Sequence, residues 1–382
     1  MNRILLIFGT RPEAIKLCPL VHELRARPGL FDVQVCVTAQ HRGMLDQVLT
    51  VFRVVPDYDL DLMSPDQTLP SLTARILEAI GHQVMNTVRP DMVIVQGDTT
   101  TTMAAALAAF YHKVPVGHVE AGLRTGDLQQ PFPEEMNRVL TSRLASVHFA
   151  PTARAAANLA AEGTDPSRIH ITGNTGIDAV IYVRDSLASG TLPSAAWPQL
   201  DPRRRLIVVT SHRRESFGAP FTGSMRAIAR IAARGDVDVV YPVHRNPNVL
   251  APAHEILGHC PNVHLLEPLS YVPFVDLMRR CAFLITDSGG VQEEAPSLGK
   301  PVLVLREKTE RPEAVDAGTV KLVGTSEERI VTEASRLLDD PEEYLRMTRV
   351  HNPYGDGHAS ARIADAMTSY FNNLTQQLEP LT

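Results

Sequence analysis

Short apolar runs rich in Val, Ile and Leu alternate along the chain with longer amphipathic segments. This alternation is typical of α/β folds, in which helices connect parallel strands and cover both faces of the sheet. The first half of the chain predicts strands at 3–8, 33–38, 92–97, 115–120, 147–151 and 169–173. The second half predicts strands at 205–212, 237–244, 262–268, 282–290, 301–307 and 320–324.

A polar, proline-punctuated stretch at 187–205 separates the two series and is expected to be a surface loop near a domain junction. The chain has 382 residues, more than a typical single domain, which favours two α/β domains. The segment 360–374 predicts a final helix that packs back onto the first domain. The glycine-rich segment 352–360 before it is expected to be a turn that closes the second domain.

The two halves of the sequence share a repeated pattern. In 92–122 and again in 282–308, an apolar strand ends at an Asp that Thr, Ser or Gly follows, and a helix, a Lys and a second apolar strand come next. In open α/β sheets the carboxyl ends of the strands are where ligands bind. Two such domains facing each other would form one deep cleft.

The composition of the chain argues against several classes of function. The net charge of −6 argues against a nucleic-acid partner, which needs a concentrated basic surface. The cysteines, at positions 18, 36, 260 and 281, form no C-x-x-C and read as small buried side chains in a reducing compartment. The fourteen histidines show no metal-ligand spacing, and no segment is apolar enough to span a membrane. The sequence therefore predicts a cytoplasmic protein without metal or membrane partners.

The segment 286–301, "TDSGGVQEEAPSLGKP", carries the strongest phosphate signal. Ser288, Gly289 and Gly290 would lie at a helix start, where free N–H groups favour an anion and glycine permits close approach. Glu294, further along, could accept hydrogen bonds from ribose hydroxyls. An N-cap at Asp287 or Ser288 with a simple turn explains the same residues, and the pattern leaves both open.

Two further strand ends carry cations. In "GTRPEAIK", 9–16, Arg11 and Lys16 follow the first strand, without a dinucleotide-binding glycine fingerprint. In "TSHRRES", 210–216, His212, Arg213 and Arg214 follow a strand of the second half and suit a diphosphate. Ordinary solvated surface charge remains the alternative for both groups.

Carboxylates form the other candidate cluster. Asp98 and Glu120 each end a predicted strand, and Glu134 and Glu135 open a predicted helix. Asp98 could instead cap the helix at "TTTT", and the glutamates could simply favour a helix start. Glu134 and Arg138 are four residues apart, which predicts an orienting ion pair. Carboxylates beside a cationic phosphate site suggest proton transfer near a phosphate-bearing leaving group.

These motifs together resemble the non-hydrolysing UDP-N-acetylglucosamine 2-epimerases of bacteria. The similarity rests on "GTRPEAIK", "TAQHR", "QGDTTTT", "GHVEAGLRTGD", "PFPEEMNR", "SHRRES", "YPVH", "TDSGGVQEEAPSLGKPVLVLR", "TERPEA" and "NPYGDG", which run from the first strand to the final loop. It implies two Rossmann-like, doubly wound domains with a central cleft, a glycosyltransferase-B-like architecture, in a homodimer. The first domain, with the acid/base residues, would span 1–173 plus 361–382, and the UDP-binding domain 174–360.

The resemblance implies reversible epimerisation at C2 between UDP-GlcNAc and UDP-ManNAc, for surface polysaccharide synthesis. UDP would leave as C2 loses its proton, giving 2-acetamidoglucal, and would then add back, without a redox cofactor or a metal. The family's catalytic residues match Asp98, Glu120, Glu134 and His212. Its nucleotide-sugar contacts match Arg11, Lys16, Phe274, Ser288, Gly289, Gly290, Glu294 and Arg311.

The sequence departs from the family pattern in places. Leu269 stands where some relatives carry Gln near the base. Gln40 and His244 match a second, activating UDP-GlcNAc site, but Gly43 and Asp66 replace the Gln and Arg of regulated relatives. A lost amide and a reversed charge beside a diphosphate should weaken that site, which predicts simple hyperbolic kinetics.

Two other functions stay open at this point. A hydrolysing epimerase or a glycosyltransferase of the same architecture would release UDP. A nucleotide-sugar binder without catalysis would need no carboxylates, so the three spaced acids make it the weakest alternative.

Overall fold

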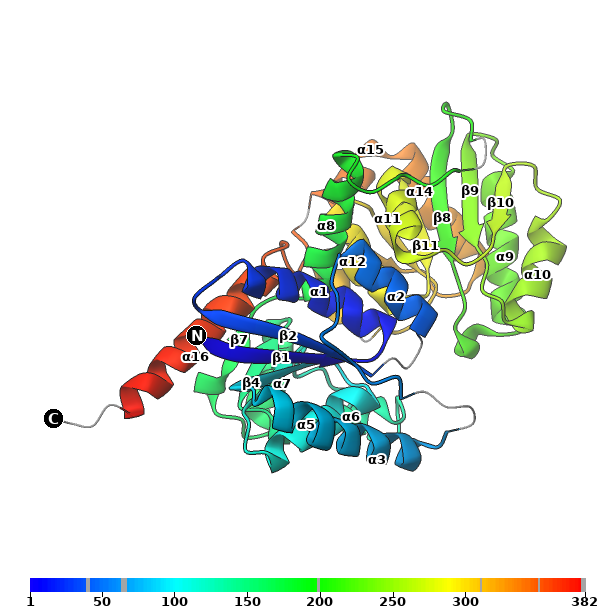
Figure 1. Ribbon diagram of the computed structural model, residues 1–382. Coiled ribbons are helices and arrows are strands. Elements are labelled where there is room, and N and C mark those ends of the chain that lie inside the picture. Colours follow the sequence, from blue (N-terminus) through cyan, green and yellow to red (C-terminus); the bar gives the residue numbers. More distant parts are fainter. Residues whose placement is uncertain (39–41, 63–66, 198–199, 310, 350, 379–382) are drawn as a thin grey trace. The chain divides into compact units, whose positions relative to one another are not determined.

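The structure is a computed structural model that describes residues 1–38, 42–62, 67–197, 200–309, 311–349 and 351–378. Its contacts divide the chain into two compact units (Figure 1). Unit 1 comprises Met1–Ala179 and Gly355–Thr382, and unit 2 comprises Val180–Tyr354. The chain therefore passes between the units inside a helix and just before the last helix. The sequence placed these two boundaries at 173/174 and 360/361, and it assigned "NPYGDG" to the second domain.

Unit 1 contains a seven-stranded sheet in the order β3-β2-β1-β4-β5-β6-β7, with every neighbouring pair parallel. Its strands are β1 (Asn2–Phe8), β2 (Phe31–Val37), β3 (Tyr58–Asp59), β4 (Met92–Gln96), β5 (Val116–Val119), β6 (Val147–Ala150) and β7 (Ile169–Ile171). The hydrophobic pattern does not predict β3, because a two-residue strand leaves no periodic signal.

The helices of unit 1 pack on both faces of this sheet. They are α1 (Arg11–Arg25), α2 (Arg42–Val51), α3 (Leu69–Ala79), η1 (Ile80–Met85), α4 (Asn86–Val88), α5 (Thr100–Tyr111), α6 (Glu134–Leu144), α7 (Ala153–Ala161), η2 (Pro166–Arg168) and α16 (Ala359–Leu378). α5 packs between α3 and α6, and α1 packs against α2 and α16. Figure 1 shows α16, in red, alongside α1, so the last helix packs on the first domain as the sequence predicts.

Unit 2 contains a six-stranded parallel sheet in the order β10-β9-β8-β11-β12-β13. Its strands are β8 (Arg205–Thr210), β9 (Val237–Pro242), β10 (Val263–Leu266), β11 (Phe283–Thr286), β12 (Val302–Val304) and β13 (Val320–Leu322). Its helices are η3 (Arg214–Ser216), α9 (Ala219–Ala232), α10 (Pro247–Leu257), α11 (Tyr271–Arg280), α12 (Gly289–Glu294), η4 (Ala295–Leu298), α13 (Pro312–Ala317), α14 (Glu327–Asp339) and α15 (Pro341–Thr348), and α8 (Thr175–Ala188) contains the boundary with unit 1.

Each sheet has one point at which the strand order reverses direction. In unit 1 this switch lies between β1 and β4, and in unit 2 between β8 and β11. Strand interiors on either side are fully buried and apolar, as for Leu5, Val93, Val208 and Leu284. The apolar cores thus fix two rigid strand ends side by side in each unit, which is where doubly wound sheets bind ligands. The prediction of two doubly wound α/β domains is confirmed.

No helix in the described part of the chain is both long enough and apolar enough to cross a membrane. The four cysteines are free thiols, three of them buried and Cys260 half-buried.

Candidate active site

The switch point of unit 1 gathers three of the predicted site residues. β1 leads through Gly9 and Thr10 into α1, which begins at Arg11. β4 ends at Gln96, two residues before Asp98, and β5 ends at Val119, one residue before Glu120. Because β1, β4 and β5 are neighbouring parallel strands, their carboxyl ends meet at one edge of the sheet.

Glu120 is held by a donor on each carboxylate oxygen. Its Oε1 lies 2.5 Å from Nζ of Lys16, and its Oε2 accepts a hydrogen bond from Nε2 of Gln96. The Glu120 side chain is 8% exposed, and its backbone is left-handed with φ of 62°. Lys16, a predicted nucleotide contact, is therefore ion-paired to a candidate catalytic carboxylate.

Asp98 is fixed by α6. Arg138 approaches its Oδ2 with Nε at 2.9 Å and Nη2 at 2.8 Å, and Asn137 donates its amide to the Asp98 carbonyl at 2.9 Å. The predicted Glu134–Arg138 pair is wrong, because Arg138 turns back one helical turn to Glu135 and across to Asp98. Asp98 does not cap α5 either. Thr99 does so, accepting from the backbone N–H of Thr102.

The buried Glu135 holds Arg138 in place. It is 1% exposed and accepts hydrogen bonds from the backbone N–H of Thr125 at 2.9 Å and of Gly126 at 3.1 Å, besides Arg138. Its neighbour Glu134 is half-buried, and among the described residues no side chain forms an ion pair or hydrogen bond with it. The same holds for Arg11. Neither side chain would have to leave a partner in the described part of the chain to bind a ligand.

Glu13 is a residue of this region that the sequence interpretation missed. It is 1% exposed, and its Oε2 accepts from the backbone N–H of Gly9 at 3.1 Å and of Thr10 at 2.7 Å. Its Oε1 accepts from the hydroxyls of Thr99 at 2.7 Å and Thr102 at 3.2 Å. Burial raises the pKa of the Glu13 carboxyl, although these hydrogen bonds oppose that rise. The T-x-x-E spacing of a capping box would have revealed it.

In unit 2 the buried Asp287 organises the switch point. It follows β11, is fully buried, and its Oδ2 accepts from the backbone N–H groups of His212 at 2.7 Å and Arg213 at 2.8 Å and from the Ser211 hydroxyl at 3.1 Å. Burial alone would raise its pKa, but the His212 side chain and the backbone N–H groups hold the pKa below its usual value. Asp287 therefore shapes the turn after β8 and does not cap α12.

The His212 ring is oriented by this carboxylate. Its Nδ1 lies 3.1 Å from Asp287 Oδ1, so the second ring nitrogen, Nε2, is left to face a ligand. The His244 ring stacks on it with centroids 5.7 Å apart and planes 18° apart. His244 Nδ1 accepts from the backbone N–H of Asn246 at 3.1 Å, which places the proton of the neutral ring on Nε2.

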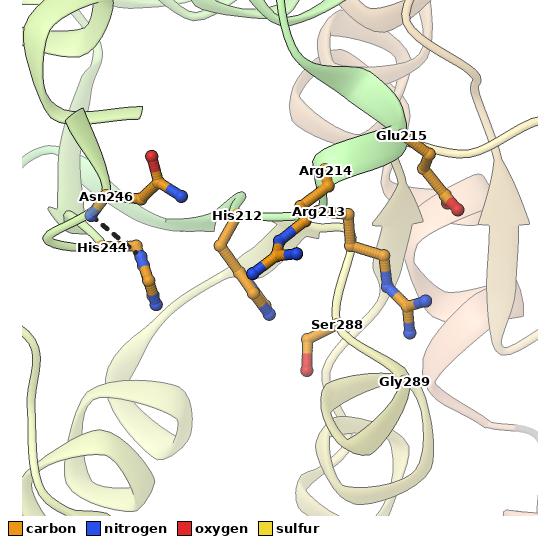
Figure 2. A pocket seen from close by; sticks show the side chains of 8 residues that line it. All are labelled: His212, Arg213, Arg214, Glu215, His244, Asn246, Ser288 and Gly289. Atoms are coloured by element: carbon orange, nitrogen blue, oxygen red, sulfur yellow. Dashed lines mark hydrogen bonds between the residues drawn. The ribbon is translucent and has the colours of Figure 1, made fainter. Parts of the chain in front are cut away.

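These groups line a hollow of about 520 Å³ in unit 2 (Figure 2). Its lining comprises His212, Arg213, Arg214, Glu215, His244, Asn246, Ser288 and Gly289. Figure 2 shows the rings of His212 and His244 pointing into the same space as the Ser288 hydroxyl. A hollow with two arginines and two imidazoles offers charge-assisted donors to an anion such as a diphosphate.

Arg311 packs against the edge of this hollow. A Cβ on Gly289 would lie 2.7 Å from the Arg311 guanidinium carbon, so a larger residue there would displace the Arg311 side chain. Arg311 Nε donates to Glu293 Oε1 at 2.6 Å. Gly290 and Glu294 lie on α12 behind Gly289, and the half-buried Phe274 lies on α11.

The predicted second site is only partly described. Gln40 and Asp66 lie outside the described residues, and Gly43 lies in the first turn of α2. His244, assigned to that site on resemblance, lines the same hollow as His212.

Two doubly wound units, each with charged groups at its switch point, define an α/β protein of the nucleotide-binding type. The family model "UDP-N-acetylglucosamine 2-epimerase" matches residues 22–368. The UDP-N-acetylglucosamine 2-epimerase of Salmonella typhimurium is 58% identical over 96% of this chain and 99% of its own length. This chain belongs to the UDP-N-acetylglucosamine 2-epimerase family, as the sequence motifs predict.

Solved structures of proteins from this family share the fold of this chain. The enzyme from Neisseria meningitidis bound to UDP-GlcNAc is 45% identical, with a TM-score of 0.84 over 96% of this chain and all of that one. The enzyme from Methanocaldococcus jannaschii in complex with UDP-GlcNAc and UDP is 32% identical, with a TM-score of 0.74 over 96% of this chain and 99% of that one.

Proposed function

We propose that this chain interconverts UDP-GlcNAc and UDP-ManNAc, as a non-hydrolysing UDP-N-acetylglucosamine 2-epimerase. The observation that carries the proposal is the set of carboxylates at the unit 1 switch point. Lys16 and Gln96 bind the Glu120 carboxylate, and Arg138 binds that of Asp98. Carboxylates in fixed positions suit a proton transfer at a carbon centre. Family membership supports the substrate class.

The C2 proton of the sugar is not acidic, because no carbonyl is adjacent to it, so the proposed route is elimination. A carboxylate takes the C2 proton, the C2–H electron pair forms the C1=C2 bond of 2-acetamidoglucal, and the C1–O bond breaks with its electrons leaving on UDP. UDP then adds back to C1 while a carboxylic acid protonates C2 from the other face. Asp98, Glu120 and Glu134 are the proposed acid/base groups.

Unit 2 is the proposed UDP-binding part. His212, oriented by Asp287, would donate from Nε2 to the diphosphate as negative charge develops on the leaving oxygen. Arg213 and Arg214 line the same hollow. Arg11, Lys16, Phe274, Ser288, Gly289, Gly290, Glu294 and Arg311 are the proposed remaining nucleotide-sugar contacts. Nothing in this scheme requires a redox step.

Two wider proposals accompany the activity. A homodimer is supported by exposed apolar side chains on the adjacent helices α5 and α6, namely Phe110, Tyr111, Met136 and Leu140, and sedimentation velocity would report the mass. A cytoplasmic role in surface polysaccharide synthesis rests on the resemblance alone. Glycan composition in a strain that lacks the protein would test it.

Incubation with UDP-GlcNAc in deuterated water tests the reaction. We expect deuterium at C2 and accumulation of UDP-ManNAc, with free UDP staying at trace levels. Glu120→Gln should abolish both signals, whereas Glu162→Gln, which alters an ion-paired carboxylate of unit 1 bonded to Arg124, should retain them. Stoichiometric UDP release without C2 exchange would instead identify a hydrolase or a glycosyltransferase.

A further inference from the structure

A buried amide lies beside the candidate catalytic carboxylates. Gln96 is the last residue of β4 and is 3% exposed. Its side-chain Nε2 donates a hydrogen bond to Oε2 of Glu120. A buried amide costs free energy unless its polar atoms are paired, so a Gln in this place calls for a specific partner. Neither the motifs nor the family comparison assigns it a role.

The backbone around Gln96 is rigid. In the β4–β5 ladder Gln96 is paired with Val119, the residue before Glu120. The Gln96 carbonyl accepts from the Thr102 hydroxyl at 2.6 Å, and the Gly97 N–H donates to the Val119 carbonyl at 3.0 Å. The amide therefore projects from a strand end that is anchored on both sides, which makes it a fixed reference point for its partner.

Glu120 needs such a partner more than an ordinary strand-end residue does. Its φ of 62° places it in the left-handed region, which non-glycine residues adopt at a cost and which is concentrated at functional sites. Its Oε2 packs over Gly97, 3.5 Å from where a Cβ of that glycine would lie. Lys16 is ion-paired to the other oxygen, Oε1. A single ion pair to a long lysine side chain leaves the carboxylate plane free to rotate.

We infer that Gln96 is a positioning residue: its amide N–H fixes Oε2, so that with Lys16 on Oε1 the Glu120 carboxylate keeps one orientation toward the C2 carbon of the sugar. The inference rests on the proposed function. Gln96 touches no reacting atom and acts through Glu120. A neutral donor suits this task, because it orients the carboxylate without adding a second titratable group.

Two substitutions separate positioning from packing. Gln96→Met keeps length and volume but removes the donor. Gln96→Glu keeps the shape and replaces the donor by a carboxyl group against Glu120. The matched control is Gln34→Met, the same change on β2 of the same sheet, away from Glu120. The readouts are C2 deuterium exchange under saturating UDP-GlcNAc, its pH profile, the Kd for UDP, and the midpoint of thermal unfolding.

We expect Gln96→Met to lower kcat for exchange by about tenfold or more, while the Kd for UDP stays within about twofold, because orientation matters in the chemical step. In Gln96→Glu two adjacent carboxyls would share a proton, so the acidic limb of the exchange profile should move to higher pH. A role in packing alone lowers the unfolding midpoint of Gln96→Met and leaves its kcat for exchange at the wild-type value. Gln34→Met should match the wild-type protein in kcat.

The outcomes are distinguishable. A wild-type protein that exchanges deuterium, with a Gln96→Met variant of equal kcat and a Gln96→Glu variant of unchanged pH profile, would overturn the positioning role alone. A wild-type protein without C2 exchange would overturn the proposed function, and the positioning role with it. If Gln96→Met does not fold, Gln96→Glu, whose shape matches that of the native side chain, decides by its kcat above the acidic limb. An ionised carboxyl donates no hydrogen bond there, so a lower kcat supports the positioning role and a wild-type kcat overturns it.

Discussion

Glu13 connects, through one buried carboxylate, the turn that carries Arg11 with the turn that carries Asp98. Each of its oxygens serves a different turn, with Gly9 and Thr10 on one side and hydroxyls on the other. Because the group is 1% exposed, its charge is costly, and burial raises its pKa. The geometry of the unit 1 site therefore depends on a titratable residue that need not touch the substrate.

The raised pKa of Glu13 affects stability with a defined sign. A carboxyl whose folded pKa lies above its unfolded value of 4.5 supports the fold at low pH and loses that contribution as pH rises through the folded pKa. The glutamine in Glu13→Gln cannot ionise. The difference in the free energy of unfolding, wild type minus variant, should therefore fall as pH rises above 4.5. A tenfold change in the acid dissociation constant between the folded and unfolded chains corresponds to about 1.4 kcal/mol. Urea unfolding from pH 4 to 8 checks this, and a difference that is flat or rises with pH would contradict it.

For single residues, the sequence predicted which side chains lie at the site better than it predicted their hydrogen-bond and ion-pair partners. It singled out Asp98, Glu120 and His212 from their places after strands, and the structure puts them at the two switch points. It paired Arg138 with Glu134, because helical spacing reports only neighbours on one helix. The actual partner, Asp98, lies 40 residues away in the chain, and such a contact exists only after the sheet has formed.

Among elements, strands with long apolar runs were predicted to within a few residues, because a buried parallel strand needs continuous apolar side chains. The exact strand ends were not. β11 ends at Thr286, whereas the predicted strand continued to 290, since "DSGG" belongs to the turn and α12. β3 was missed because it is held at the sheet edge by pairing with β2 and not by its own pattern.

α6 is the element that relates the two carboxylates Asp98 and Glu134. Its Arg138 serves both Asp98 and the buried Glu135 with separate guanidinium nitrogens, which a lysine cannot do. We expect Arg138→Lys to lower kcat by about tenfold and to cost about 1–3 kcal/mol of stability, because Glu135 loses a buried partner. Exchange rates and urea unfolding measure both effects. Arg143→Lys, exposed on the same helix, is the control, and equal losses in the two variants would contradict a specific role.

For the whole molecule, the pattern that repeats in the two halves of the sequence corresponds to two sheets, each with one switch point. The sequence could predict this division, because each half repeats the strand–Asp–helix plan. It could not predict where the chain crosses, since the crossing falls inside α8, whose hydrophobic pattern is uninterrupted at Ala179. The proposed roles divide in the same way, with the fixed carboxylates in unit 1 and the cationic hollow in unit 2.

This division predicts that binding and chemistry respond to different variants. Arg213→Met, in the hollow of unit 2, removes the proposed charge-assisted contact with UDP, worth about 1.5–3 kcal/mol, so the Kd for UDP should rise about tenfold to a hundredfold. Asp98→Asn, in unit 1, should abolish C2 deuterium exchange and leave the Kd for UDP within about twofold, because the carboxylate is proposed to act on the sugar and not on UDP. Arg226→Met, which breaks an exposed ion pair with Glu327 in unit 2, should change neither. Calorimetric titration with UDP and the exchange assay give both quantities on the same samples. If Asp98→Asn weakened UDP binding as strongly as Arg213→Met, the carboxylates would be part of the nucleotide site and the assignment of chemistry to unit 1 would be wrong.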